Sequence, residues 1–239
     1  MSYYLMHQAN YKKVSDINKI AGVRQDHHSV LMNAACLVEE AHEQIVAVKN
    51  KDYHGEHGLM DAIPDTAFVC YGLLYLADFS IVKPKEAVGT EWKSLLEEGE
   101  EAIMHEAHVS YQIARDIETL FTLHRYSEAI VRIHDLLLHS IKFARGMGIH
   151  IQKAIEVVHT ANATKFDTTE MDGLLTQSKY DELGVMTKIR QVVHEDVDYW
   201  VNVVDGDQFA NNKFWPNRKW LKSHVWQEPR YTTACLSEK

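Results

Sequence analysis

The sequence contains little glycine, proline and cysteine: 11, 4 and 3 residues among 239. Tight turns depend mostly on glycine and proline, so a β-sandwich or β-barrel with many such turns is excluded. Cys36, Cys70 and Cys235 are too few for a disulfide scaffold and are expected to be reduced thiols. No apolar run reaches the ~18 residues that a membrane helix needs, and the segment MSYYLMHQANYKK has no signal-peptide h-region. We therefore expect a cytoplasmic protein with no membrane partner.

Positive charge is scarce too, because 34 acidic residues outnumber 25 basic ones and the formal net charge is −9. Such a chain has no global attraction for nucleic acid or for an anionic membrane, so neither is expected as a partner. A protein of this charge that handles phosphates needs a metal ion to neutralise them. The positions of the acidic residues are therefore the most informative feature of the sequence.

Apolar residues recur at helical spacing along most of the chain. The clearest stripe runs through 30–49, after N-cap candidates that begin with Asp26. A second helix is expected from about Asp61 to about residue 79, because Pro64 is tolerated only in a first turn. Further helices are expected over 14–22, over 91–124 with a break near Gly99, over 127–145 with Ser127 as N-cap, over 151–159 and over 185–204.

Period-two alternation, the pattern typical of half-buried strands, is not convincing in any segment, and 166–184 is expected to be a loop. The predicted fold class is therefore all-α. We expect a single domain over 1–204, with an insertion at about 83–128 or a duplicated helical pair that extends to about 145. The remaining residues, 205–239, are expected to form an irregular, aromatic and basic extension.

Five acidic residues on two neighbouring predicted helices are placed to converge on one cation. They form E-E-x-x-E on the first helix and D-x-x-x-D on the second, and positions three and four apart share a helix face. Carboxylate oxygens are the ligands that Mg²⁺ and Mn²⁺ prefer, and such close like charges would repel one another without a cation. The residues are Glu39, Glu40, Glu43, Asp61 and Asp65.

A simpler interpretation of the same residues stays open. E-E-x-x-E on a helix is often a solvated face, Asp61 can serve as an N-cap, and Asp65 can be a first-turn acid favoured by the helix dipole. The flanking sequence favours a metal site, because the glutamates stand within LVEEAHEQIV and Asp65 precedes TAFVCYGLLYLA, which is expected core. Acids placed against a core usually have partners or bound ions.

These segments resemble a known family. LVEEAHEQIVAV followed by DAIPDTAFVCYG resembles the all-α nucleoside triphosphate pyrophosphohydrolases, which include MazG-like proteins, phosphoribosyl-ATP pyrophosphatase and the dimeric dUTPases. VSDINKIAG is similar to the helix that opens phage-type members, and GIHIQKAIEVVHTANATKF is similar to the family's closing segment. The resemblance covers roughly 14–80 and 145–166. It implies a MazG-like helical bundle that associates as a dimer or tetramer.

The resemblance also implies an activity, in which a (d)NTP is hydrolysed to the monophosphate and pyrophosphate with Mg²⁺, for which Mn²⁺ substitutes. Its role would lie in nucleotide-pool control or in phage nucleotide metabolism, in the latter case as a viral protein in the host cytoplasm. Glu39 or Glu40 would be the general base that orients the attacking water. The implied metal ligands are Glu40, Glu43, Asp61 and Asp65, and the implied contacts to substrate phosphate or sugar come from Asn162 and Lys165, with His159 matching the family histidine.

The sequence departs from the family pattern in two respects. No glutamate stands three residues before either aspartate of the second helix, so Asp61, or less directly Glu56, takes over that ligand role. A second E-E-x-x-E, Glu97, Glu98 and Glu101, lies in the insertion, and Asp135 follows at a suitable distance. These residues are either a degenerate internal repeat or a solvated charge run.

Other functions compete with this one. His134-Asp135, with His105 or His108 upstream and Asp196 or Asp198 downstream, is compatible with an HD-type metal phosphohydrolase acting on nucleotides. A non-enzymatic helical binding protein is the other alternative, with the acids as a solvated face. Lys213, Arg218, Lys219 and Lys222 in the tail offer a site for DNA, although the net charge argues against it.

Overall fold

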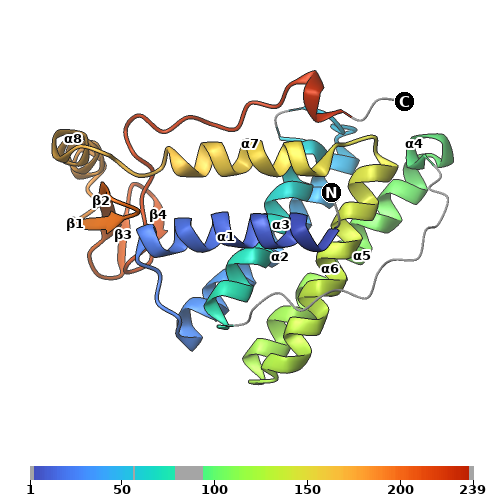
Figure 1. Cartoon of the computed structure of the whole chain (residues 1–239), viewed down its shortest axis with the longest axis horizontal. Helices are drawn as coiled ribbons and strands as arrows, with labels where there is room; N and C mark the ends of the chain where they lie inside the picture. Colours follow the sequence, from blue (N-terminus) through green and yellow to red (C-terminus); the bar gives the residue numbers. More distant parts are fainter. Residues whose placement is uncertain (1–2, 56, 79–93, 237–239) are drawn as a thin grey trace. The chain divides into compact units, whose positions relative to one another are not determined.

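The computed structural model describes residues 3–55, 57–78 and 94–236 (Figure 1). Its α-helices are α1 (Tyr3–Ala21), α2 (His27–Lys49), α3 (Leu59–Leu76), α4 (Leu95–Glu98), α5 (Glu100–Thr122), α6 (Tyr126–Gly146), α7 (Ile151–Ala163) and α8 (Glu170–Asp181). Its strands are β1 (Thr187–His194), β2 (Val197–Val204), β3 (Gln208–Ala210) and β4 (Lys213–Trp215), and a 3₁₀ turn, η1, spans Thr233–Cys235.

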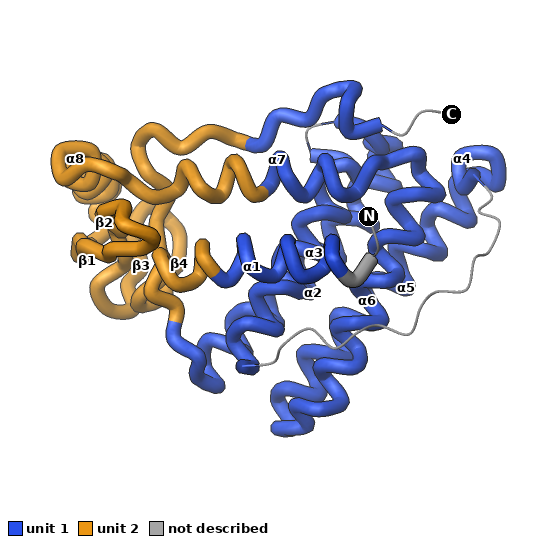
Figure 2. The backbone as a smooth tube through the Cα atoms, viewed as in Figure 1, with its two compact units in different colours: residues 1–15, 24–158, 229–239 blue, residues 16–23, 159–228 orange. Residues whose placement is uncertain are grey.

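The chain divides into two compact units, which Figure 2 colours separately. Unit 1 contains residues 1–15, 24–158 and 229–239, and unit 2 contains residues 16–23 and 159–228. Helices α1 and α7 contribute residues to both units. Residues 205–228 of the expected C-terminal extension therefore belong to unit 2 together with 159–204.

The predicted all-α class is confirmed only in part. The described residues are mostly helical, with eight α-helices and 62% helix, but they also form small antiparallel sheets, β1 with β2 and β3 with β4. The helix expected over 185–204 is wrong. That segment forms strands β1 and β2, paired from Thr187↔Val204 to His194↔Val197. The physical reason is the density of β-branched residues in TKIRQVVH and VDYWVNVV, whose stiff side chains suit a pleated strand better than a helix.

Four long helices of unit 1, α2, α3, α5 and α6, pack into a bundle in which each contacts two of the others. Helix α2 packs against α3 and α5, and α6 packs against the same two helices. Helix α2 fills the interior with a stripe at helical spacing, Val30, Ala34, Leu37, Ala41, Ile45 and Val48. Full burial of each larger side chain in such a stripe contributes roughly 1.5–3 kcal/mol to folding. The helical bundle therefore follows from the amphipathic pattern read in the sequence.

The boundaries of α2 and α3 follow from local chemistry. The Asp26 carboxylate accepts a hydrogen bond from the Ser29 N–H at 2.8 Å, which confirms Asp26 as an N-cap. Helix α3 begins at Leu59, two residues before the expected start. Pro64 therefore lies in the second turn rather than the first, where it has no N–H to donate to the Met60 carbonyl.

Helix α3 lies mostly inside unit 1. Among the described helices it alone is long and apolar enough to cross a membrane, by length and composition only, and 72% of its 18-residue window is buried in the protein. A buried core helix passes the same test, so the finding is a weak indication of a membrane span.

Glycine at 99 breaks the helix expected over 91–124. Its φ of +98° is outside the range of L side chains, and it separates α4 from α5. Helix α6 starts at Tyr126 after Arg125, so the expectation of Ser127 as N-cap is wrong. The first part of the insertion expected at about 83–128, up to residue 93, lies outside the described residues, as does Glu56.

Unit 2 has its own small core. The loop expected over 166–184 contains helix α8 instead, whose N-cap Thr169 accepts a hydrogen bond from the Asp172 N–H. Tyr180 of α8 meets Trp215 of β4 edge to face, with ring centroids 5.9 Å apart. The rest of this core is supplied by Val185, Val204 and Leu221. The aromatic tail is therefore partly core rather than wholly irregular.

Candidate active site

The predicted carboxylates lie on the hairpin formed by α2 and α3. Glu39 and Glu43 are exposed on α2, and Glu40 between them is half-buried. Asp61 lies in the first turn of α3 and Asp65 one turn later, and both are half-buried. The acids therefore extend from the solvent to the edge of the core, as their apolar flanks predict.

A buried polar link holds the two helices in register beside the carboxylates. Gln44 and Thr66 are both fully buried, and the Gln44 amide donates to the Thr66 hydroxyl at 2.7 Å. Thr66 in turn donates to the Ala62 carbonyl at 2.8 Å. Gln44 directly follows Glu43, and Thr66 directly follows Asp65. This hydrogen bond therefore helps to fix the register between α2 and α3, and with it the positions of their acidic residues relative to one another.

Glu43 and Asp61 influence each other electrostatically. Partial burial of its carboxyl raises the pKa of Glu43, and the negative charges of Asp61 and Glu39 raise it further. Nearby His57 and His42 act in the opposite direction. Repulsion between carboxylates on different helices is the condition under which a divalent cation gains most by binding between them.

Tyr231, from the C-terminal segment of unit 1, reaches this acidic row. Its hydroxyl donates a hydrogen bond to Asp61 Oδ1 at 2.8 Å. Burial raises the pKa of the phenol, and the charges of Asp65 and Asp61 raise it further, so the donor keeps its proton at neutral pH. His57 Nδ1 lies 4.0 Å from the other Asp61 oxygen. Sequence reasoning missed Tyr231, because no local pattern relates it to a helix 170 residues earlier.

The carboxylate oxygens of the α2–α3 acids are not all close to one another. Within residues 3–55, 57–78 and 94–236, the only three metal-ligating side chains with ligand atoms all within 4.8 Å of one another are Asp16, His194 and Glu195 of unit 2. Glu40, Glu43, Asp61 and Asp65 form no such group among themselves. Mutual repulsion of the carboxylates favours this wider spacing. Three of these acids are nevertheless linked electrostatically. The charge of Asp61 acts on the Glu43 carboxyl, and the charges of Asp61 and Asp65 both act on the Tyr231 phenol.

The expected substrate contacts belong to unit 2. Asn162 is 7% exposed near the end of α7, where its carbonyl accepts a hydrogen bond from the Lys165 N–H at 3.1 Å. The Lys165 ammonium lies 5.0 Å from the ring centroid of Trp220, a cation–π contact. His159 is buried. Lys165 thus has a packing role inside its own unit.

The second acidic motif is not assembled like the first. Glu97 and Glu98 end α4, Glu101 lies in the first turn of α5 beyond Gly99, and all three are exposed. Asp135 is exposed and lies 3.3 Å from Arg132. These positions match a solvated charge run.

The histidine–aspartate alternative gains no geometric support. His134 is half-buried near His7, and burial lowers its pKa, while its neighbour Asp135 pairs with Arg132. His108 contacts the Met104 carbonyl of its own helix at 2.8 Å. Asp196 and Asp198 belong to unit 2. In the part of the chain that the structure describes, no group of three metal ligands includes His134 or Asp135.

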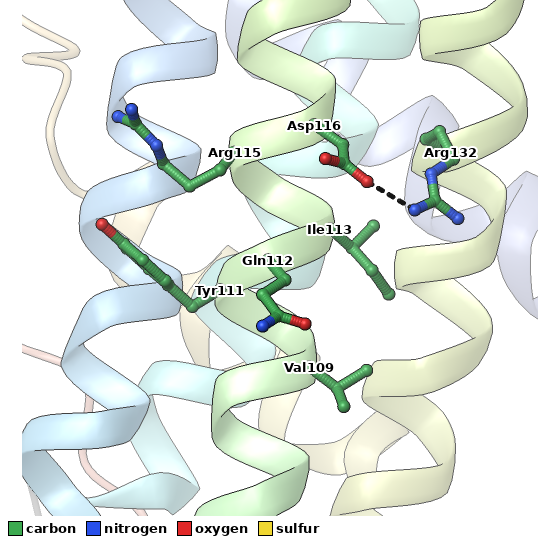
Figure 3. Close-up of a pocket in the computed structure, with 7 residues that line it drawn as sticks. All are labelled: Val109, Tyr111, Gln112, Ile113, Arg115, Asp116 and Arg132. Atoms are coloured by element: carbon green, nitrogen blue, oxygen red, sulfur yellow. Dashed lines mark hydrogen bonds and ion pairs between the residues drawn. The ribbon is translucent and has the colours of Figure 1, made fainter.

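A hollow of about 490 Å³ is lined by residues of α5 and by Arg132 of α6 (Figure 3). Figure 3 shows Arg132 of α6 directed at Asp116 of α5, and the two groups are 2.5 Å apart. Arg115, also on its wall, pairs with Glu118 at 2.9 Å. None of the predicted site residues lines this hollow. Because its charged groups pair with acids of the same helices, we place the candidate site at the α2–α3 carboxylates instead.

Comparison with known proteins finds no family model, no curated protein and no solved structure that matches the chain. What the site does is therefore inferred from its side chains and from the sequence patterns.

Proposed function

We propose that the chain is a metal-dependent nucleoside triphosphate pyrophosphohydrolase of MazG-like fold, which converts a (d)NTP to the monophosphate and pyrophosphate. The observation that carries the proposal is the electrostatic coupling of Glu43 on α2 with Asp61 on the neighbouring helix α3. The family resemblance of the same two segments adds the reaction class. The pairwise packing of α2, α3, α5 and α6 is compatible with a helical bundle of this kind.

The donor set fits Mg²⁺. Glu40, Glu43, Asp61 and Asp65 offer only oxygen ligands, and three of them are coupled to one another or to Tyr231 by charge. A bound Mg²⁺, or Mn²⁺ in its place, would neutralise the triphosphate and lower the pKa of a bound water. The chain's net charge of −9 makes such neutralisation necessary for any nucleotide to approach.

The remaining roles fall to side chains of α2. Glu39 is exposed and precedes the half-buried Glu40, so either carboxylate is accessible to a water that attacks the α-phosphorus. One of them would accept the proton of that water as general base. Asn162 and Lys165 remain the proposed contacts to phosphate or sugar. A homodimer or homotetramer, a cytoplasmic location and a role in nucleotide-pool control or phage nucleotide metabolism complete the proposal.

The test is a panel of canonical and modified nucleotides, incubated with the purified chain with and without Mg²⁺ or Mn²⁺ and scored for monophosphate and pyrophosphate. Metal-dependent pyrophosphate release is expected. Release of intact triphosphate would favour the HD-type alternative. No turnover on any nucleotide would leave the helical binding protein as the better description.

Site variants make the test specific. Glu40→Gln and Asp65→Asn should each lower turnover by about 100-fold or more, the lower end of what a positioned acid–base or charged group contributes. The matched control is Glu101→Gln, which neutralises an exposed glutamate of the second E-E-x-x-E. It should retain activity. Circular dichroism and thermal unfolding of all three variants separate loss of the site from loss of the fold.

A further inference from the structure

A second set of possible metal ligands lies in unit 2, outside the proposed active site. Asp16 comes from α1, His194 is the last residue of β1, and Glu195 is the first residue of the turn that follows. One ligand atom from each lies within 4.8 Å of the other two. His194 Nε2 and Asp16 Oδ1 are 3.4 Å apart.

The β1–β2 hairpin presents these groups in an unusual way. Its two turn residues, Glu195 and Asp196, have φ values of +48° and +62°, the left-handed pair of a type I′ turn. Glycine or asparagine normally takes such positions. A second contact holds the same strand to α1, because the Arg190 guanidinium donates to the Ala21 carbonyl at 3.0 Å. The strand is therefore tied to α1 at Ala21 and again at Asp16.

The donor atoms have the chemistry of a first-row transition-metal site. His194 Nε2 is buried and makes no hydrogen bond within the described structure, although it lies beside the Asp16 carboxylate. In a tetrahedral site with metal–ligand distances of about 2.0–2.2 Å, neighbouring ligand atoms are about 3.3–3.6 Å apart. The separation of 3.4 Å between His194 Nε2 and Asp16 Oδ1 matches that edge. One imidazole nitrogen and two carboxylates suit Zn²⁺ better than Mg²⁺.

We propose that Asp16, His194 and Glu195 bind a Zn²⁺-class divalent cation, with the fourth position open to water. The ion joins α1 to the tip of the β1–β2 hairpin and stabilises unit 2. One cation already competes for the site, because the Lys19 ammonium lies 3.6 Å from the same Asp16 oxygen. Binding the metal displaces Lys19 toward solvent, where half of its side chain already lies.

The test measures Zn²⁺ binding by calorimetry and Co²⁺ binding by visible absorption, on the full chain. The parent and all variants carry Glu43→Gln and Asp61→Asn, which remove two of the four proposed α2–α3 ligands, so that a change in Zn²⁺ binding between them reports on unit 2 and not on the proposed hydrolase site. His194→Gln and Glu195→Gln should each weaken Zn²⁺ binding by more than about tenfold. Glu195 is an exposed turn residue, so its variant tests the site even if the His194 variant does not fold.

Two control variants decide between a metal site and a simple ion pair. Asp196→Asn, in the same turn but outside the group, should bind Zn²⁺ like the parent. Lys19→Gln should bind it more tightly, because the competing ammonium is gone. A parent chain that binds no Zn²⁺ in the micromolar range, or Zn²⁺ binding unchanged by His194→Gln and Glu195→Gln, would overturn the proposal in favour of an Asp16–His194 ion pair.

Discussion

The Tyr231 hydroxyl donates a hydrogen bond to Asp61 Oδ1 at 2.8 Å, and so ties the C-terminal segment of unit 1 to the first turn of α3. The contact places a phenol that keeps its proton beside two aspartates of the candidate site. It also occupies one of the oxygens that a metal ion would use. This contact, and the buried polar groups His7, Gln44 and Thr66 of the same unit, lead to four predictions.

Tyr231→Phe should lower the free energy of unfolding by about 1.5–3 kcal/mol, the usual contribution of a hydrogen bond to a charged group. Urea unfolding of the metal-free chain measures it. Asp61→Asn and the double variant complete a double-mutant cycle. If the contact contributes as its geometry indicates, the double variant loses less than the sum of the two single losses. Strict additivity would contradict the prediction.

Asp61→Asn should lower the pKa of Glu43, because the Asp61 charge is among the causes that raise it. The carboxyl carbon of Glu43, followed by NMR during a pH titration, reports the change. Glu39→Gln should act in the same direction, since its charge also raises that pKa. The control Glu101→Gln should leave it unmoved. A Glu43 pKa unaffected by Asp61→Asn would mean that the two carboxylates are not coupled.

His7 should make the protein less stable in acid. It is 5% exposed, its Nδ1 lies 2.6 Å from the Tyr71 hydroxyl, and burial, with a smaller effect of His134, lowers its pKa from 6.5 to about 4. Between those pH values the unfolded chain binds more protons than the folded one, so stability falls as pH falls from about 6.5 to 4. The full loss from this one group is about 3 kcal/mol.

The free energy of unfolding, measured by urea at several pH values between 7 and 4, tests this prediction. His7→Gln should flatten the profile in that range, although it lowers stability at pH 7 through the altered contact with Tyr71. His108→Gln removes an exposed histidine and should leave the slope unchanged. An equal slope in the His7 variant and the parent would contradict the assignment.

Thr66→Val should lower the free energy of unfolding by about 1–3 kcal/mol, because it leaves the fully buried Gln44 amide without its acceptor. Replacing both partners, as in Gln44→Leu with Thr66→Val, should recover much of that loss, since no polar group is then left unpaired. Thermal and urea unfolding measure both. A double variant that is less stable than the single one would show that the link has a further role.

Some of the architecture was accessible from the sequence. Helix α2 was predicted because its amphipathic stripe and its Asp26 cap depend only on residues within the helix and next to it, so they can be recognised without knowing the tertiary contacts. The hairpin at 187–204 was predicted as a helix, because short β-branched runs satisfy more than one period and only pairing decides between them. Helix α8 was missed because its apolar residues, Met171, Leu174 and Leu175, were set among polar turn-forming ones, and these three side chains remain exposed.

The sequence by itself determined the order of the acids and the helix face that each row shares, because spacings of three and four residues are set within one helix. Only the tertiary structure decided which of them meet. Tyr231 reaches Asp61 across 170 residues, and His194 reaches Asp16 across 178 residues. Such contacts depend on how helices and strands pack, since loop closure brings distant residues together only when buried surface elsewhere offsets its entropy. A local sequence pattern contains no information about this balance between loop-closure entropy and buried surface.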